Sequence, residues 1–121
     1  MSKKTPIQLA RNRADKFVTP VTRALYGDVC CVCGKPKVTG HHYYPKSSHG
    51  HLRYNTDNFV PLCYYCHMFK VHSMADPDTL ETIRKWMGTK INKLKKIPRP
   101  QGTYMTLKWY EDNIYELKDS L

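Results

Sequence analysis

The sequence predicts a small α+β domain in which helices at both ends flank a segment rich in cysteine and histidine. The chain has 121 residues, which is enough for one compact domain but too short for two ordinary ones. Both ends show helix signals, namely capping residues, proline in the first turn and apolar residues three or four positions apart. All five cysteines and all six histidines lie within residues 30–72, which indicates that this central segment has a different function from the helical ends.

The first segment, residues 1–26, is expected to form a basic helical arm in two pieces. Thr5 is a suitable N-cap before Pro6 in a first turn. Pro20 is expected to end this helix and start a second one that Gly27 terminates. The apolar positions of the two pieces are Ile7, Leu9, Ala10, Ala14, Val21, Ala24 and Leu25.

Residues 27–75 suit short strands and turns, with a helix beginning near Leu62 or Cys63, and residues 76–121 form a helical extension. Asp76 and Pro77 predict the start of a helix that Gly88 ends. A shorter pattern follows until Pro98, and Thr106 then caps the last helix. Its apolar stripe is expected to pack on the central core, and it consists of Leu107, Tyr110, Ile114, Leu117 and Leu121.

The charge of the chain indicates a polyanionic partner. There are 20 Lys and Arg against 10 Asp and Glu, a net charge of +10. Residues 84–99 hold seven basic groups and no acid. No apolar run is long enough for a membrane span, and the polar start resembles no secretion signal, so a cytoplasmic, intracellular protein is expected. The cations predicted to contact nucleic acid are Arg11, Arg13, Lys46, Arg53, Lys70 and Lys93.

Two C-x-x-C pairs predict a structural zinc site. Cys30 and Cys33 form the first pair, and Cys63 and Cys66 form the second. Four thiolates enclose a tetrahedral Zn²⁺ and leave no open position for water. A redox pair is disfavoured because the α/β pattern of thioredoxin-like proteins is absent, and disulfides are disfavoured in a reducing compartment. Cys31 is interpreted as a bystander thiol.

Further motifs lie between and beside these pairs. They are the run Gly40-His41-His42-Tyr43-Tyr44-Pro45, the run Asn58-Phe59-Val60-Pro61-Leu62-Cys63, and His67 directly after Cys66. Together with the cysteine pairs, they resemble the HNH endonuclease family in its two-knuckle zinc form. The run Leu52-Arg53-Tyr54-Asn55, followed by Asn58, is similar to phage recombination nucleases of the NinG type. The resemblance implies a ββα-metal core, hydrolysis of phosphodiester bonds in DNA, and a phage or bacterial host cell.

The same resemblance implies roles for individual residues. His42 would be the general base and His41 a ligand of a catalytic divalent ion. Asn58 would either orient the base through a backbone contact or ligate the metal, and His67 would be a ligand or a phosphate contact. The ion would be Mg²⁺ or, since imidazole is softer than carboxylate, Mn²⁺, Ni²⁺, Co²⁺ or Zn²⁺. His72 ranks below His67 because five residues turn about 140° round an ideal α-helix.

Two other functions fit part of the pattern. One is a zinc-knuckle nucleic-acid-binding protein without catalysis. The other is a zinc-stabilised protein–protein adaptor, but this function would not explain the large positive charge of the chain. His49 and His51 flank Gly50 in an expected polar loop, with a DNA or metal contact as the alternative. The sequence leaves open whether the DNA is double-stranded or branched, and whether the protein is a monomer or a homodimer.

Overall fold

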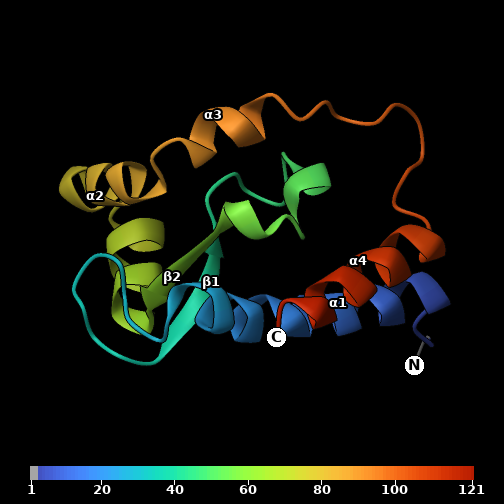
Figure 1. Ribbon diagram of the computed structural model, residues 1–121, viewed down its shortest axis with the longest axis horizontal. Helices are drawn as coiled ribbons and strands as arrows, with labels where there is room; N and C mark the ends of the chain where they lie inside the picture. The colour runs from blue at the N-terminus through green and yellow to red at the C-terminus, as the bar shows by residue number, and fades with distance from the viewer. Residues whose placement is uncertain (1–2) are drawn as a thin grey trace.

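The computed structural model describes residues 3–121 and shows a small α+β fold (Figure 1). Helices α1 and α4 lie side by side, the hairpin of β1 and β2 occupies the middle, and α2 and α3 cover its far side. The elements are α1 (Pro6–Tyr26), β1 (Val38–His42), the 3₁₀ turns η1 (Gly50–Leu52) and η2 (Thr56–Asn58), β2 (Phe59–Cys63), the π-helix η3 (Cys66–Ser73), α2 (Pro77–Met87), α3 (Lys90–Lys95) and α4 (Leu107–Asp119). The predicted fold class is confirmed. None of the helices within residues 3–121 has both the length and the apolar character needed to cross a membrane.

The two strands pair antiparallel, and their register determines where the polar residues of the centre lie. Val38 pairs with Cys63 at one end of the hairpin, and His42 pairs with Phe59 at the other. Every residue of β2 is buried. Pro61 lacks a backbone N–H and is tolerated because its N and carbonyl face the outer edge of the two-stranded sheet, where the carbonyl accepts from the Cys31 amide at 3.0 Å. The hairpin therefore joins a cysteine-bearing end to a histidine-bearing end.

Helix α1 is continuous through Pro20, where the sequence predicted two pieces. A proline inside a helix removes one backbone hydrogen bond and costs roughly 3 kcal/mol, so tertiary packing has to offset that loss. Ala10, Ala14, Val18 and Val21 form one buried face at spacings of four, four and three. Thr19 does not cap a second helix, because its Oγ1 accepts a hydrogen bond from the Gly40 amide of β1 at 3.1 Å.

The predicted helix starts in the third segment are confirmed by their caps. Asp76 accepts a hydrogen bond from the Thr79 amide at 3.0 Å at the start of α2. Thr106 accepts one from the Trp109 amide at 3.2 Å at the start of α4. The helix expected near Leu62 begins only after Cys63, because β2 continues to that residue.

Two apolar clusters form the interior. The first surrounds Cys30, Cys63 and Cys66 and is covered by Ile83 and Met87 of α2 and by Leu94 of α3. The second lies between α1 and α4, and its members include Ala10, Ala14, Tyr54, Phe59, Tyr110, Ile114 and Leu117. The buried residues of the α4 stripe therefore pack against α1 and share a cluster with Tyr54 and Phe59 of the central segment. The small alanines of α1 let the second helix approach closely.

Substitution of Gly40 tests the contact between β1 and α1. A Cβ atom at this position would lie 2.6 Å from Thr22 Oγ1 and 2.8 Å from Val18 Cγ1. We expect Gly40→Ala to lower the free energy of unfolding by about 1–3 kcal/mol through overpacking, as measured by urea denaturation.

The control is a double-mutant cycle with Thr22→Ala, which removes the closest atom. The double variant should lose less stability than the sum of the two single variants. Strict additivity would show that Gly40 is not in steric contact with α1.

Candidate functional site

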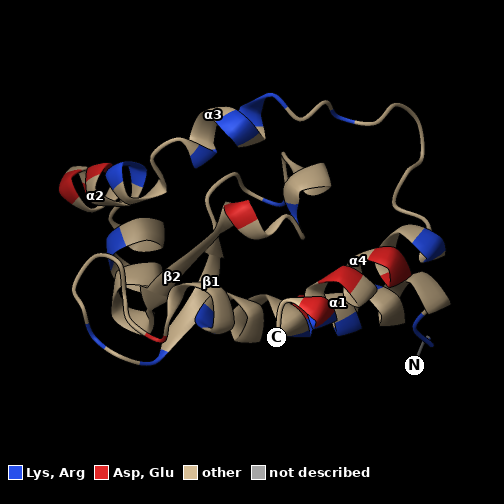
Figure 2. Cartoon of the chain, in the orientation of Figure 1, with Lys and Arg blue, Asp and Glu red and all other residues tan. Residues whose placement is uncertain are grey.

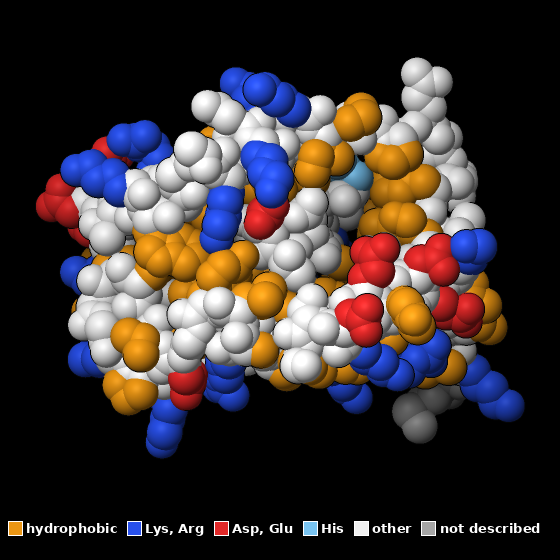
Figure 3. Space-filling model, in the orientation of Figure 1, with side chains coloured by type: hydrophobic (Ala, Val, Ile, Leu, Met, Phe, Trp, Pro, Cys, Tyr) orange, Lys and Arg blue, Asp and Glu red, His pale blue; other side chains and the backbone are white. Residues whose placement is uncertain are grey.

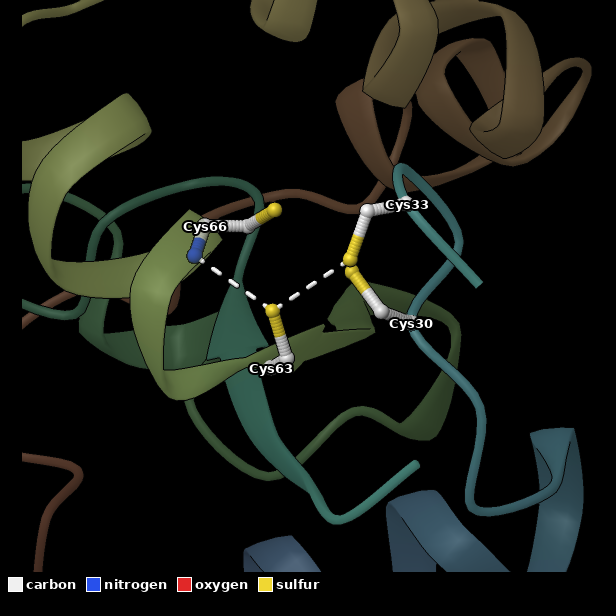
Figure 4. Close-up of side chains that lie close together, drawn as sticks. All are labelled: Cys30, Cys33, Cys63 and Cys66. Carbon is white, nitrogen blue, oxygen red and sulfur yellow. Dashed lines mark hydrogen bonds between the residues drawn. The ribbon is translucent and has the colours of Figure 1, made fainter. Parts of the chain in front are cut away.

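Four cysteines meet at one end of the hairpin. Figure 4 shows Cys30 and Cys33 on the loop after α1, Cys63 at the end of β2 and Cys66 in the first turn that follows. Their sulfur atoms all lie within 4.8 Å of one another, and the Cys33 and Cys63 sulfurs are 3.5 Å apart. A tetrahedral zinc site with Zn–S bonds of about 2.3 Å requires sulfur separations of about 3.8 Å. The cluster therefore fits a structural Zn²⁺, as the sequence predicted.

The backbone of the first cysteine pair forms the tight turn that such a site requires. The Gly34 amide donates to the Cys30 carbonyl at 3.0 Å, and the Cys30 amide donates to the Lys35 carbonyl at 2.8 Å. Gly34 has a φ of 77°, in the left-handed region that favours glycine.

The adjacent cysteines Cys30 and Cys31 differ in acidity, whereas burial raises the pKa of two other members of the cluster, Cys33 and Cys66. Burial alone would raise the pKa of Cys30, but hydrogen bonds from the backbone at Cys33, Cys63 and Val32 lower it to about 7. Burial raises the pKa of Cys31 to about 12, and this residue lies outside the four-sulfur cluster. Cys31 therefore stays a protonated thiol at neutral pH.

Three histidines form a second cluster beside the first. Nitrogen atoms of His41, His67 and His72 lie within 4.8 Å of one another. The ring centroids of His67 and His72 are 4.7 Å apart, and those of His41 and His67 are 5.1 Å apart. The low rank that ideal α-helix geometry gave to His72 is wrong, because η3 is a π-helix. Its hydrogen bonds join residues five apart, which places His67 and His72 on the same face.

The surroundings of the cluster favour neutral imidazoles with free lone pairs. Burial, together with His67 and His72, lowers the pKa of His41 to about 3. Nδ1 of His67 lies 3.3 Å from Thr39 Oγ1, and the Thr39 hydroxyl donates to the Leu62 carbonyl at 3.2 Å. Since that hydroxyl proton is already used, Thr39 accepts from Nδ1–H, and Nε2 of His67 keeps its lone pair for a metal ion.

His42 follows His41 on β1 but has different neighbours. Its Nε2 lies 2.8 Å from the Arg53 carbonyl oxygen, and its ring packs edge-on against Phe59. A carbonyl only accepts hydrogen bonds, so Nε2 carries the proton and Nδ1 carries the free lone pair. Burial lowers the pKa of His42, which keeps the ring neutral at neutral pH and leaves its lone pair available to accept a proton.

Asn58 is fully buried, and its side chain is committed to backbone groups. Its Oδ1 accepts from the Tyr44 amide at 2.8 Å. Its Nδ2 donates to the carbonyls of Tyr44 at 3.1 Å and Leu52 at 3.3 Å. Of the two roles considered from the sequence, this geometry favours orientation through the backbone over metal ligation.

Asp15 is a site residue that the sequence analysis missed. Its carboxylate accepts two hydrogen bonds from the Arg53 guanidinium, at 3.0 and 2.7 Å, and one from the Tyr54 hydroxyl at 2.7 Å. The Arg53 carbonyl is the group that holds His42, so Asp15 anchors the segment behind the predicted base. The sequence offered one signal for this residue, since Asp15 is the only acidic residue among the basic residues 1–26.

His42 and the three-histidine cluster open onto one cavity of about 490 Å³. Helix α1 forms one wall, and the loop after β1 forms the rim, where Lys46 contributes a cation. The lining residues are Asp15, Val18, Thr19, Gly40, His41, His42, Pro45, Lys46, Ser47, His67 and His72. The structure thus brings together His41, His42, His67 and Lys46, as predicted, and adds His72 and Asp15.

The other predicted nucleic-acid contacts have varied surroundings, and none of them lines this cavity within residues 3–121. Arg11 donates to the Tyr110 hydroxyl at 2.9 Å, and Lys93 pairs with Asp57 at 3.2 Å. Arg13 is exposed and Lys70 is half-buried. Their contact with nucleic acid stays a prediction, and for Arg53 the pairing with Asp15 favours a structural role.

Comparison with known proteins identifies the central segment. Residues 30–72 match the family model described as HNH endonuclease, which spans both clusters. No curated protein and no solved structure matches the chain. The central segment is therefore similar to the HNH endonuclease family, which suggests a nuclease-type function on nucleic acid, while the likeness to NinG-type nucleases stays a prediction.

Paired cysteine variants test the zinc site. We expect Cys33→Ser to lose bound zinc and at least about 3 kcal/mol of stability, because three thiolates hold the ion poorly and the surrounding core depends on it. Zinc content by elemental analysis and denaturant unfolding are the measurements.

Cys31→Ser is the matched control and should keep one zinc per chain with nearly unchanged stability. Equal zinc loss in both variants would contradict the assignment of the four ligands.

Proposed function

From the HNH domain at residues 30–72, we propose that this protein is a metal-dependent DNA endonuclease in which His42 is the general base. One observation carries the proposal. A neutral His42, with its Nδ1 lone pair free, lines the same cavity as three histidines whose nitrogens converge. Reactions at a phosphodiester bond need both a base for water and a cation for the developing charge.

The three histidines fit a divalent ion. Three neutral imidazoles suit Zn²⁺, Ni²⁺, Co²⁺ or Mn²⁺ better than Mg²⁺, which prefers oxygen ligands. Asp15 is the only carboxylate in the cavity lining within residues 3–121, and it is already paired with Arg53 and Tyr54. When bound to His41, His67 and His72, such an ion supplies positive charge next to the phosphate oxygens.

The protein's own groups carry out the proton transfer. Nδ1 of His42 accepts a proton from water, whose oxygen attacks phosphorus while the bond from phosphorus to the leaving oxygen breaks. The hydrogen bond from Nε2 to the Arg53 carbonyl holds the ring and stabilises the imidazolium that forms. Lys46 at the rim faces the cavity and supports binding of the substrate phosphate.

The alternative is a zinc-knuckle nucleic-acid-binding protein without catalysis. Binding alone requires cations and exposed donors, and it gives no reason for a buried neutral histidine beside a three-histidine cluster. The geometry therefore favours the enzyme.

Substitution of His42 tests the reaction. We expect His42→Ala to reduce nicking of supercoiled plasmid by about 10²–10⁴-fold, the usual contribution of a general base. Binding of Co²⁺ to the histidine cluster, followed by absorption spectroscopy, should be unchanged.

The matched variant His72→Ala should instead lose Co²⁺ affinity. Cleavage retained by His42→Ala would contradict the assignment of the base. If the wild-type protein fails to cleave in the presence of each divalent ion tested, the binding module is the better interpretation.

Asp15 is predicted to act as a positioning residue behind His42. Asp15→Asn breaks the double contact with Arg53, and we expect kcat to fall on the order of 10-fold with KM nearly unchanged, because small displacements of a base reduce the rate without weakening phosphate binding. Steady-state nicking kinetics provide the measurement.

Asp112→Asn, which breaks only the exposed pair with Lys108, is the control and should leave both constants unchanged. A rise in KM alone for Asp15→Asn would show that Asp15 acts on substrate binding instead.

A further inference from the structure

A second cavity lies on the other side of the loop that follows β1. It has a volume of about 330 Å³ and is enclosed by this loop, by η1 and by the end of α3 with the segment after it. Leu52 and Leu94, both buried, line it with apolar surface. A cavity of this size and mixed lining is in the range of small-ligand sites, and no step of the proposed reaction uses it.

Aromatic rings form one side of this cavity. Tyr44 and His49 have ring centroids 4.9 Å apart at an angle of 40°, and His49 and His51 are 6.1 Å apart at 32°. Such tilted, closely spaced rings offer flat surfaces on which any of the four nucleobases can stack, because stacking does not depend on base identity.

His51 contributes its ring to the lining of the cavity. Its Nδ1 is buried and has no hydrogen-bond partner among residues 3–121. This atom is closed to solvent, so a nucleobase in the cavity meets the accessible part of the ring and stacks on it.

Two cations complete the lining. Lys95 and Arg99 come from the run of residues 84–99, which contains seven basic groups and no acid. The Arg99 guanidinium donates to the Ser48 carbonyl, which ties this segment to the loop after β1. A phosphate next to a stacked base would therefore meet positive charge at the edge of the cavity.

The two cavities are neighbours along one short loop. Tyr44 lines the second cavity, and Lys46, two residues later, lines the first. Since two residues span at most about 7 Å, a nucleic-acid strand that crosses this loop reaches both cavities within a few nucleotides. Asn58 fixes the crossing point, because its side chain binds both the amide and the carbonyl of Tyr44.

We propose that the second cavity binds one unpaired nucleotide of the substrate strand, with the base on Tyr44, His49 and His51 and its phosphate at Lys95 and Arg99. The inference rests on the proposed nucleic-acid substrate and deepens it, because a base inside a duplex cannot enter such a cavity. The protein should therefore prefer DNA that carries a single-stranded segment beside the cleaved bond.

Substitutions of two neighbouring lysines, one inside the cavity and one outside it, test this site. The assay uses the His42→Ala protein and a fluorescein-labelled 12-nucleotide oligothymidine, with fluorescence anisotropy as the readout. Lys95→Gln should weaken binding at least about 5-fold, and Lys96→Gln, which changes an exposed lysine outside the cavity, should change it less than about 2-fold. Equal effects of the two substitutions would overturn the proposal in favour of a diffuse basic surface.

A second comparison tests contact with the base. His51→Ala, which removes one ring of the stacking surface, should weaken oligothymidine binding about 10-fold but leave binding of an abasic oligonucleotide of equal length unchanged. A 12-base-pair duplex should bind more weakly than the oligothymidine, and equal or tighter duplex binding would overturn the proposal. Because no cleavage is measured, failure here is distinct from failure of the endonuclease assignment, which depends on plasmid nicking.

Discussion

The four-cysteine cluster is the constraint on which the geometry of the centre depends. Cys63 ends β2 and Cys66 lies in the first turn after it, so a metal ion that holds both also fixes the direction in which η3 leaves the hairpin. His67 and His72 are carried by η3, and His41 is carried by β1, which pairs with β2. A structural ion thus positions three nitrogens that it does not touch, in a domain whose interior is divided between two small apolar clusters.

At the other end of the hairpin, the buried Asn58 and the half-buried Asp15 and Arg53 hold the backbone in place. Asn58 binds backbone groups of Tyr44 and Leu52, and Asp15 binds Arg53, whose carbonyl orients His42. These contacts are satisfied hydrogen bonds inside the protein, where removal of one partner leaves a costly unpaired group. The predicted base and the metal ligands are therefore held by independent supports, and variants can weaken one without the other.

Local chemistry could be predicted from the sequence, whereas features that depend on tertiary packing could not. The cysteine pairs and the Asp76 cap follow from short-range rules and are confirmed. The continuity of α1 through Pro20 depends on packing against β1 and α4, which a propensity argument omits. The approach of His72 to His67 depends on π-helical hydrogen bonds, which no spacing rule for an α-helix includes.

The position of charge, more than its total, determines where a nucleic acid can lie. The net charge of +10 first indicated flanking arms, but α1 is packed into the fold. Figure 2 shows acidic positions along α4 next to basic positions of α1, and Figure 3 shows a group of acidic side chains beside Lys and Arg in the same region. Basic residues of α3 and the segment after it form a second group beside the loop that follows β1. A strand bound as proposed would follow this group, cross the loop at Lys46 and reach the cavity lined by His42, and the acids of α4 would disfavour a path on their own side of the molecule.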